Sequence, residues 1–305
     1  MSQKGKKNIP ASVRQKILNR ARNDNRPFNE LLQYYAMERF LYRLSKSSHS
    51  DRYILKGALM LRVWNAPQFR PTMDIDLLGK TDRDAAAIVA QIREIIAVDV
   101  TPDGLFFDPE SIQTEQITEA AEYEGIRVRF QGNLDTARIN MQIDIGFGDA
   151  IFPEPEKADL PTLLDFPAPT IMCYSRESAI AEKFEAMVKL GVLNSRMKDF
   201  YDIWLLSRQF DFNGKKLAEA IRKTFEKRGT DYAVDIVAFS LDFANDKQAQ
   251  WTAFRKRLQQ DSVPESFEII VSAIKEFLKP IISSIAQETP DPTKWVASGP
   301  WDQDI

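Results

Sequence analysis

The sequence predicts an α+β protein, in which a small mixed sheet with helices is followed by a helical second half. Two segments, residues 73–78 and 138–147, alternate apolar and polar residues as half-buried strands do. After about residue 170 the apolar residues follow helical spacing instead, as far as residue 287. A loop between the two patterns is rich in proline, with Pro153, Pro155, Pro161, Pro167 and Pro169. We therefore expect a subdomain boundary near residue 170.

The part before this loop alternates between helical and strand patterns. Apolar spacing predicts a helical hairpin over residues 10–46, with Pro27 between its helices. Residues 53–55 predict a strand, Lys56 and Gly57 a turn, and residues 58–64 a short helix that precedes the strand of Asp74. A further helix is expected over residues 84–97, and further strands near 126–131 and 138–147. We expect an N-terminal helical hairpin (1–50) and an α/β core (51–170).

The part after the loop carries two apolar helix faces. The first face consists of Ile180, Phe184, Met187 and Val188. After a break at residues 191–195, the second face consists of Met197, Phe200, Tyr201, Trp204 and Leu205. We expect a helical subdomain over residues 171–288. The tail, 289–305, is acidic and rich in proline but holds two tryptophans, so it is either disordered or docked by those rings.

Composition excludes several kinds of site. The chain has 305 residues with one Cys, Cys173, and one His, His49, so a disulfide framework, a Cys/His zinc site and a triad that needs a second His are excluded. Catalysis must then depend on Asp, Glu, Lys, Arg or a metal. The net charge of −3 argues against a protein that coats nucleic acid, but allows a local basic cleft. Without an apolar run of membrane-spanning length or a signal peptide, we expect a cytoplasmic protein with no membrane partner.

The segment "RPTMDIDLLGK", residues 70–80, places two carboxylates one residue apart. In a strand, Met73, Ile75 and Leu77 would face a core, and Asp74 and Asp76 would share the other face. At about 4 Å and an effective dielectric near 20, two carboxylates repel by roughly 4 kcal/mol, so they require a proton, a basic partner or a divalent cation such as Mg²⁺. A solvated strand face is the alternative.

The segment "RINMQIDIGFGD", residues 138–149, offers a third carboxylate. Its apolar residues alternate with polar ones, and Asp144 belongs to the polar set. If this strand lies beside the strand of Asp76, three carboxylates converge on one face of the sheet, which is hard to tolerate without a metal. An isolated Asp144 would be a surface residue.

A third segment, residues 176–206, combines helical apolar faces with charged residues. The charged residues of this segment that lie outside the apolar faces are Lys183, Arg196, Lys198, Asp199 and Asp202. The last four lie near the start of a helix, where backbone N–H groups favour an anion. Alternatively, Lys198 and Asp202 form an ordinary surface pair at i,i+4 spacing.

Five ordered segments, "LKGALML", "RPTMDIDLLGK", "QIDIGFGD", "AEKFEAMVKLG" and "NSRMKDFYDIW", resemble the AbiEii/AbiGii family of nucleotidyltransferase toxins from bacterial abortive-infection toxin–antitoxin systems. The resemblance runs from about residue 50 to 210. It implies a DNA polymerase β-like nucleotidyltransferase core, with a helical C-terminal half that closes over the nucleotide.

The resemblance also implies roles for individual residues. Asp74 and Asp76 correspond to the metal-binding acids, and Asp144 to the third acid of the same sheet. Lys183 corresponds to a triphosphate ligand and Asp199 to the acid of a Lys-Asp motif. The remaining candidates for nucleotide binding are Lys56 and Gly57, as the phosphate-facing turn, together with Arg196 and Lys198. Many members have a residue with a hydroxyl group after the glycine, but this chain has Ala58 and Leu59. This departure questions how the nucleotide is held at the turn.

The function implied is transfer of a nucleoside monophosphate from a nucleoside triphosphate to RNA, dependent on Mg²⁺ or Mn²⁺. The resemblance suggests the 3′ end of tRNA as acceptor, growth arrest as the result, and an antitoxin of the AbiEi type as genetic partner. A metal-dependent glycosyltransferase and a catalytically degenerate binding protein remain alternatives. The candidates for RNA contacts are the basic residues that flank the motifs: Arg62, Arg70, Lys80, Arg127, Arg129, Arg196 and Lys198.

Overall fold

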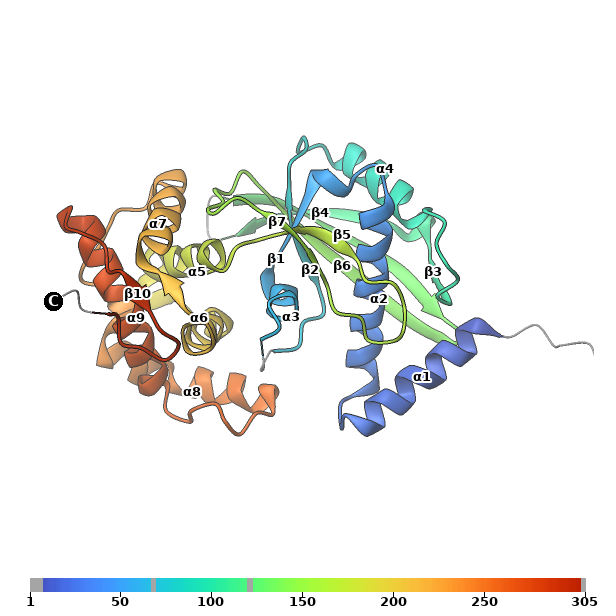
Figure 1. The fold of residues 1–305 in the computed structure, drawn as a ribbon. Coiled ribbons are helices and arrows are strands. Elements are labelled where there is room, and N and C mark those ends of the chain that lie inside the picture. Colours follow the sequence, from blue (N-terminus) through green and yellow to red (C-terminus); the bar gives the residue numbers. More distant parts are fainter. Residues whose placement is uncertain (1–7, 67–69, 120–122, 303–305) are drawn as a thin grey trace, which may run out of the picture. The chain divides into compact units, whose positions relative to one another are not determined.

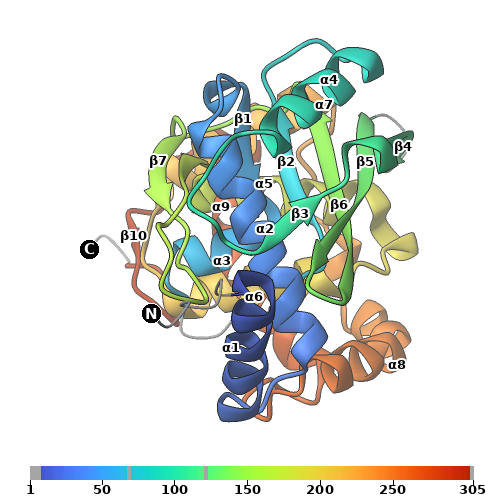
Figure 2. The ribbon, with the colours of Figure 1, turned by 90° about the vertical axis from the view of Figure 1, so that its right-hand side faces the viewer.

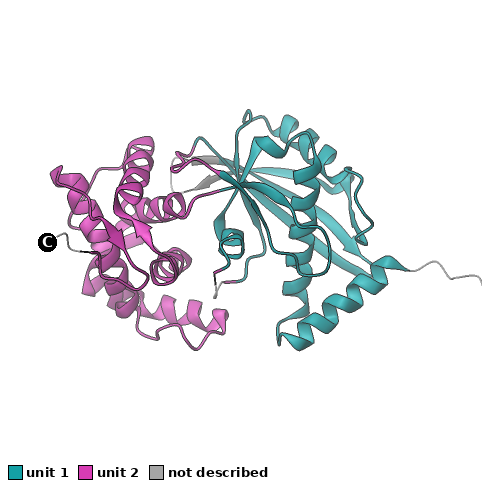
Figure 3. Cartoon of the chain, in the orientation of Figure 1, with its two compact units in different colours: residues 1–65, 71–148, 156–173 teal, residues 66–70, 149–155, 174–305 magenta. Residues whose placement is uncertain are grey.

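The computed structural model describes residues 8–66, 70–119 and 123–302, which divide into two compact units (Figure 3). Unit 1 comprises residues 1–65, 71–148 and 156–173. Unit 2 comprises residues 66–70, 149–155 and 174–305. The main division thus falls just after residue 173, and two short segments of the first half belong to unit 2. None of the described helices is both long and apolar enough to cross a membrane.

Unit 1 is built on a mixed sheet in the strand order β3-β5-β6-β2-β1-β8-β7, with β4 also paired to β5 (Figure 1). The β2–β6 and β1–β8 pairs are parallel and the others are antiparallel. The bounds are β1 Tyr53–Lys56, β2 Ile75–Gly79, β3 Leu105–Phe107, β4 Gln113–Glu119, β5 Tyr123–Leu134, β6 Ala137–Phe147, β7 Glu156–Asp159 and β8 Thr170–Cys173. The mixed sheet expected from the alternating segments is confirmed.

The helices of unit 1 are α1 (Ile9–Asn23), α2 (Phe28–Lys46), α3 (Met60–Val63) and α4 (Ala85–Ile96). Helix α2 runs across one face of the sheet (Figure 2), where the Phe40 ring packs against Phe107 and Phe130. Buried aromatic pairs of this kind stabilise a domain beyond their area burial. The two helices expected as a hairpin belong to unit 1, because α2 is buried against the sheet.

The other face of β5 and β6 is polar. Along β6 every second residue from Ile139 to Phe147 is buried, and the residues between them are exposed or half-buried. This is the period of two expected for a strand with one face on the core. Met73 departs from the expectation: it lies just before β2 and is 55% exposed, because the strand begins only at Ile75.

Unit 2 is helical, as the spacing predicts. Its helices are α5 (Arg176–Leu190), α6 (Met197–Gln209), α7 (Gly214–Arg228), α8 (Leu241–Leu258) and α9 (Phe267–Gln287). The core contains stacked and edge-to-face rings, among them Phe200 and Trp251 against Phe267. Of the residues expected on the first buried face, Val188 is only half-buried. The α+β fold class, with a small mixed sheet and a helical second half, is confirmed.

The tail is docked on unit 2 through its two tryptophans. β10 (Lys294–Trp295) pairs with β9 (Phe212–Asn213). The indole of Trp295 donates a hydrogen bond to the carbonyl of Ser207 (2.6 Å), and that of Trp301 to the carbonyl of Phe277 (2.8 Å). Both rings also pack on Phe277. Of the two alternatives for the tail, docking by the rings holds up to Asp302, and residues 303–305 lie outside the described part.

Candidate functional site

Three carboxylates converge on the polar face of the sheet in unit 1. β2 and β6 are neighbouring parallel strands, and their register places Asp76 directly beside Asp144. Asp74 lies just before β2. One carboxylate oxygen from each of the three residues lies within 4.8 Å of the others. The pairing of strands on which the sequence argument depends is thus confirmed, and we call these three residues the acidic triad.

Basic and polar side chains partly compensate the charge of the triad. β5 pairs with β6 so that Arg127 lies opposite Asp144, and its Nε and Nη2 each donate a hydrogen bond of 2.7 Å to that carboxylate. These bonds raise the pKa of the guanidinium above its ordinary value. The hydroxyl of Thr72 donates to Asp74. Arg127, proposed from the sequence as an RNA contact, is therefore engaged with the triad itself.

The donor set of the triad fits a divalent metal ion. Carboxylate oxygens are the ligands that Mg²⁺ and Mn²⁺ prefer, and the three oxygens are close enough to share one ion. Each residue is half-buried, so each carboxylate keeps access to the polar face. The guanidinium of Arg127 pairs with Asp144, and a divalent cation would offset the negative charge that three neighbouring carboxylates concentrate here.

Gly57 brings the backbone of the β1 turn against the triad. Lys56, the last residue of β1, lies opposite Asp76 in the register of β1 and β2. Gly57 follows it with φ = +71°. A Cβ on Gly57 would lie 1.8 Å from Oδ2 of Asp76, so a side chain has no room there. Ala58 and Leu59 are both buried, so the residues that lack the family's hydroxyl pack into the core.

A second group of charged residues lies within unit 2, and we call it the lysine cluster. The ammonium of Lys183 on α5 lies 3.1 Å from Oδ1 of Asp199 and 3.0 Å from Oδ2 of Asp202, both on α6. Arg196 pairs with Asp199 at 2.6 Å, and Arg70 forms a fork on Asp202 with bonds of 2.8 and 3.1 Å. All five residues thus form one buried or half-buried ionic network.

The network fixes the charges of its members. Burial by itself would lower the pKa of Lys183, but the two carboxylates outweigh it, so that pKa lies above its ordinary value. Burial would likewise raise the pKa of Asp199 and Asp202. The surrounding cations outweigh burial here too, and both pKa values lie below the ordinary range. The ammonium and both carboxylates are therefore ionised at neutral pH.

The surface pair of Lys198 and Asp202 is excluded by this geometry. Asp202 does not form a surface pair with Lys198, because it is 2% exposed and binds Arg70 and Lys183. The side chain of Lys183 is only 16% exposed. Sequence reasoning did not place Asp202 among the site residues. The available signal was its i+3 spacing from Asp199, which puts both carboxylates on one face of α6.

The other basic candidates are distributed over both units. The guanidinium of Arg62 stacks 3.7 Å from the centroid of the Tyr34 ring in unit 1. Arg129 lies on the exposed face of β5, and Lys80 is exposed at the end of β2. Lys198 is exposed at the start of α6 in unit 2. The described residues thus bring Arg127 to the triad, and Arg70 and Arg196 to the lysine cluster.

A protein family model and several solved structures match the chain. The model of the nucleotidyl transferase AbiEii toxin, Type IV TA system, matches residues 39–273. A candidate nucleotidyltransferase of Helicobacter pylori is 14% identical, with a TM-score of 0.48 over 84% of this chain and 96% of its own. The Helicobacter pylori protein JHP933 is 13% identical, with a TM-score of 0.49 over 85% and 95%. No curated protein matches in a sequence comparison. Because the family model covers more than half of the chain, the chain belongs to the AbiEii nucleotidyl transferase toxin family and is a nucleotidyltransferase.

Proposed function

We propose that this nucleotidyltransferase moves a nucleoside monophosphate from a nucleoside triphosphate onto the terminal 3′-hydroxyl of an RNA, in a metal-dependent reaction. The observation that carries this proposal is the acidic triad, three carboxylates within 4.8 Å of one another on the polar face of the sheet, in a chain of the AbiEii family. The hydroxyl oxygen bonds to the α-phosphorus, the bond between the α-phosphorus and the bridging oxygen breaks, and pyrophosphate leaves.

Asp74, Asp76 and Asp144 are the residues that would hold the metal. When bound, Mg²⁺ or Mn²⁺ would neutralise phosphate charge and make the attacking hydroxyl more acidic. Asp144 accepts the hydroxyl proton at a carboxylate oxygen, and the fork of Arg127 orients that carboxylate. Because Gly57 has no Cβ, the carboxylate of Asp76 can lie against the backbone of this turn, and we assign the turn, with Lys56, to the phosphates as the family resemblance implies.

We assign Lys183 to the triphosphate, as the family resemblance implies, with Arg196 and Lys198 as further nucleotide contacts. Asp199 is fully buried and binds both Lys183 and Arg196, so we propose that it positions these two cations. Asp202 does the same for Lys183 and Arg70. Fixing a long cationic side chain in advance reduces the entropy lost when it binds a phosphate.

The acceptor that we propose is the 3′ end of tRNA, and the expected result is loss of translation and growth arrest in the cytoplasm. A type IV toxin–antitoxin family implies an antitoxin partner and a nucleotide substrate. We propose a DNA-binding repressor of the AbiEi type as that antitoxin.

Incubation of the chain with total RNA, Mg²⁺ and each α-labelled nucleoside triphosphate in turn tests the proposal. We expect label in tRNA with at least one nucleotide, and none with Asp76→Asn. Label in another RNA would overturn the tRNA assignment. Bound nucleotide without transfer to any RNA would indicate a catalytically degenerate member.

A further inference from the structure

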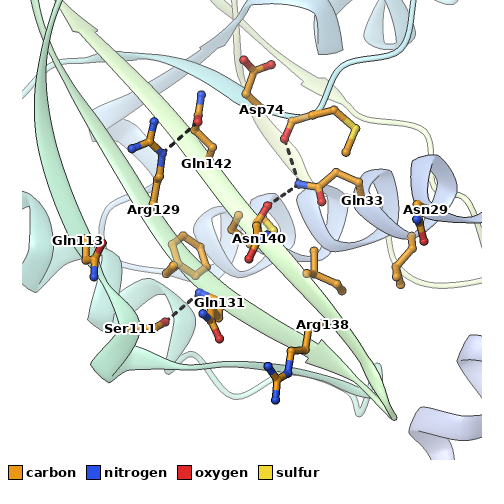
Figure 4. Close-up of a pocket in the computed structure, with 15 residues that line it drawn as sticks. Asn29, Gln33, Asp74, Ser111, Gln113, Arg129, Gln131, Arg138, Asn140 and Gln142 are labelled. Carbon is orange, nitrogen blue, oxygen red and sulfur yellow. Dashed lines mark hydrogen bonds between the residues drawn. The ribbon is translucent and has the colours of Figure 1, made fainter.

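A polar groove extends from Asp74 over the sheet of unit 1 (Figure 4). Its volume is about 730 Å³, and strands β4, β5 and β6 and the start of α2 line it. Primary amides are the most frequent polar group in this lining. We call it the amide groove, after the side chains of Asn29, Gln33, Gln113, Gln131, Asn140 and Gln142.

The register of β5 on β6 produces the groove and joins it to the acidic triad. Opposite residues of the pair share one face of the sheet. From the triad outwards, the pairs on the polar face are Arg127 with Asp144, Arg129 with Gln142, Gln131 with Asn140, and Asn133 with Arg138. At about 3.4 Å per residue, the six steps from Asp144 to Arg138 span roughly 20 Å. The groove is thus a track that ends at the triad.

Some of the amide side chains form hydrogen bonds within the protein, and others are available to bind a ligand. Gln33 of α2 donates to the carbonyls of Met73 (3.0 Å) and Asn140 (3.1 Å), which ties the helix to both strands. Gln142 accepts from Arg129, which also pairs with Glu115. By contrast, the exposed side chains of Gln131, Asn140 and Arg138 make no hydrogen bond to another described residue. These three side chains can therefore bind a ligand without giving up a partner.

An exposed aromatic ring lies at the far end of this face. β3 pairs with β5 so that Phe106 is opposite Asn133, beyond Gln131. Its neighbours Leu105 and Phe107 are buried, whereas Phe106 is 60% exposed. A phenylalanine that points away from the core offers a flat apolar face to a planar ligand.

We propose that the amide groove binds the unpaired 3′-terminal strand of the RNA acceptor, with a base stacked on Phe106 and a phosphate on Arg138. This inference rests on the proposed function, because it names how the acceptor reaches the triad. Primary amides present a donor and an acceptor together, which suits the mixed edges of exposed bases. A sheet face that combines polar side chains with an exposed aromatic ring is a common way to bind single-stranded RNA.

The charges of the groove favour this occupant over others. Asp74 lines the groove, and Glu115 pairs with Arg129 beside it. The groove is therefore not a cationic channel for an acidic peptide. An RNA strand needs a few phosphate contacts and several base contacts, and the track offers both.

The test measures binding of a fluorescent single-stranded RNA of about eight nucleotides to the full chain, in EDTA and without nucleotide. We expect Phe106→Ala to weaken binding roughly fivefold to a hundredfold, and Phe106→Tyr to retain it. Arg138→Ala should lower the slope of log affinity against log salt by about 0.7. Lys157→Ala, on the exposed edge strand β7, makes the same charge change away from the groove and should leave affinity unchanged.

The outcomes separate this inference from the proposed function. Wild-type RNA affinity in both Phe106→Ala and Arg138→Ala would overturn the groove, even if the chain transfers nucleotides. Weaker binding of nucleoside triphosphate, with RNA binding unchanged, would instead make the groove a nucleotide site and also overturn the inference. Groove-dependent RNA binding in a chain that transfers no nucleotide would support the inference and count against the proposed function. Thermal unfolding of each variant checks that the fold is retained.

Discussion

Asp76 and Asp144 occupy paired positions on the neighbouring parallel strands β2 and β6, with their carboxylates on the same face of the sheet. Like charges at directly opposite positions destabilise a sheet. Arg127 relieves part of the repulsion, since its guanidinium forks onto Asp144. A bound cation would offset the charge that these carboxylates concentrate, and its effect on stability can be measured.

Asp76→Asn should abolish transfer while the fold is retained, because it removes a metal ligand charge without a change in volume. We expect a loss of at least a hundredfold in turnover. In EDTA, the melting temperature should rise by about 2–4 °C, since repulsion with Asp74 and Asp144 is relieved. Asp82→Asn, at an exposed position of the same unit, is the matched control. An active variant that melts below the wild type would contradict a metal role.

Arg127→Met should have the opposite effect on stability. The substitution leaves Asp144 without the guanidinium that pairs with it. In EDTA we expect the free energy of unfolding to fall by about 1–2 kcal/mol, a modest cost because the pair is partly exposed, and the melting temperature to fall with it. Added Mg²⁺ should then raise the melting temperature more than it does in the wild type. Equal Mg²⁺ shifts in both proteins would show that Arg127 does not compensate the charge of the triad.

Gly57→Ala tests the closeness of the β1 turn to the triad. The φ of +71° alone costs about 1 kcal/mol for a residue with a Cβ, and the new methyl group would also displace the carboxylate of Asp76. We expect the loss of both transfer and Mg²⁺-induced stabilisation. Gly229→Ala is a sharp control, because Gly229 has a similar φ of +61° and nothing within 4 Å of the Cβ position. Full Mg²⁺ stabilisation in Gly57→Ala would rule out the close approach.

Lys183→Ala should destabilise the protein, although a role in triphosphate binding alone would leave stability unchanged. Removal of the ammonium leaves Asp199 and Asp202 each with one cation fewer in a buried network. The expected cost is about 2 kcal/mol, which chemical denaturation can measure. Lys215→Ala, at an exposed position of α7, should cost almost nothing. Lys183→Met separates charge from volume: if it is as stable as the wild type, the ion pairs are not structural.

The sequence was sufficient where the signal is local. Strict alternation in residues 138–147 predicted β6, and the pattern Asp74-x-Asp76 predicted two acids at the start of β2. The structure brings Gly57 against Asp76, whereas the phosphate-facing role that the resemblance implies for this glycine stays a prediction. These predictions need only the period of one element or a motif of a few residues.

Partners that are distant in the chain could not be predicted. Arg70 and Asp202 are 132 positions apart, so no spacing rule connects them, and Lys198 at i−4 was the obvious partner for Asp202. The bond between Arg127 and Asp144 depends on the register of β5 on β6, which the turn at Asp135 (φ +55°) sets. The exposure of Met73 depends on where β2 begins, and strand ends have a weak sequence signal.

Glu38 on α2 makes the stability of unit 1 dependent on pH. Its carboxyl is fully buried, lies 3.0 Å from Nε of Arg39 and accepts a hydrogen bond of 2.6 Å from the backbone of Leu163. Burial raises its pKa from 4.5 to about 7 despite these partners. Between these values the folded protein keeps a proton that the unfolded chain has lost, so the free energy of unfolding falls as the pH rises through this window.

The wild type should therefore lose up to about 3 kcal/mol between pH 4.5 and 7 through this group, and no more above that range. Glu38→Gln cannot ionise, so the difference in melting temperature between variant and wild type should shift in favour of the variant as the pH rises from about 5 to 7. Glu110→Gln, at an exposed position, should follow the wild type at every pH. Because Glu38→Gln also weakens the contact with Arg39, its absolute stability is not the test. A difference that stays constant across this range would mean that Glu38 is ionised in the folded protein throughout, held by Arg39.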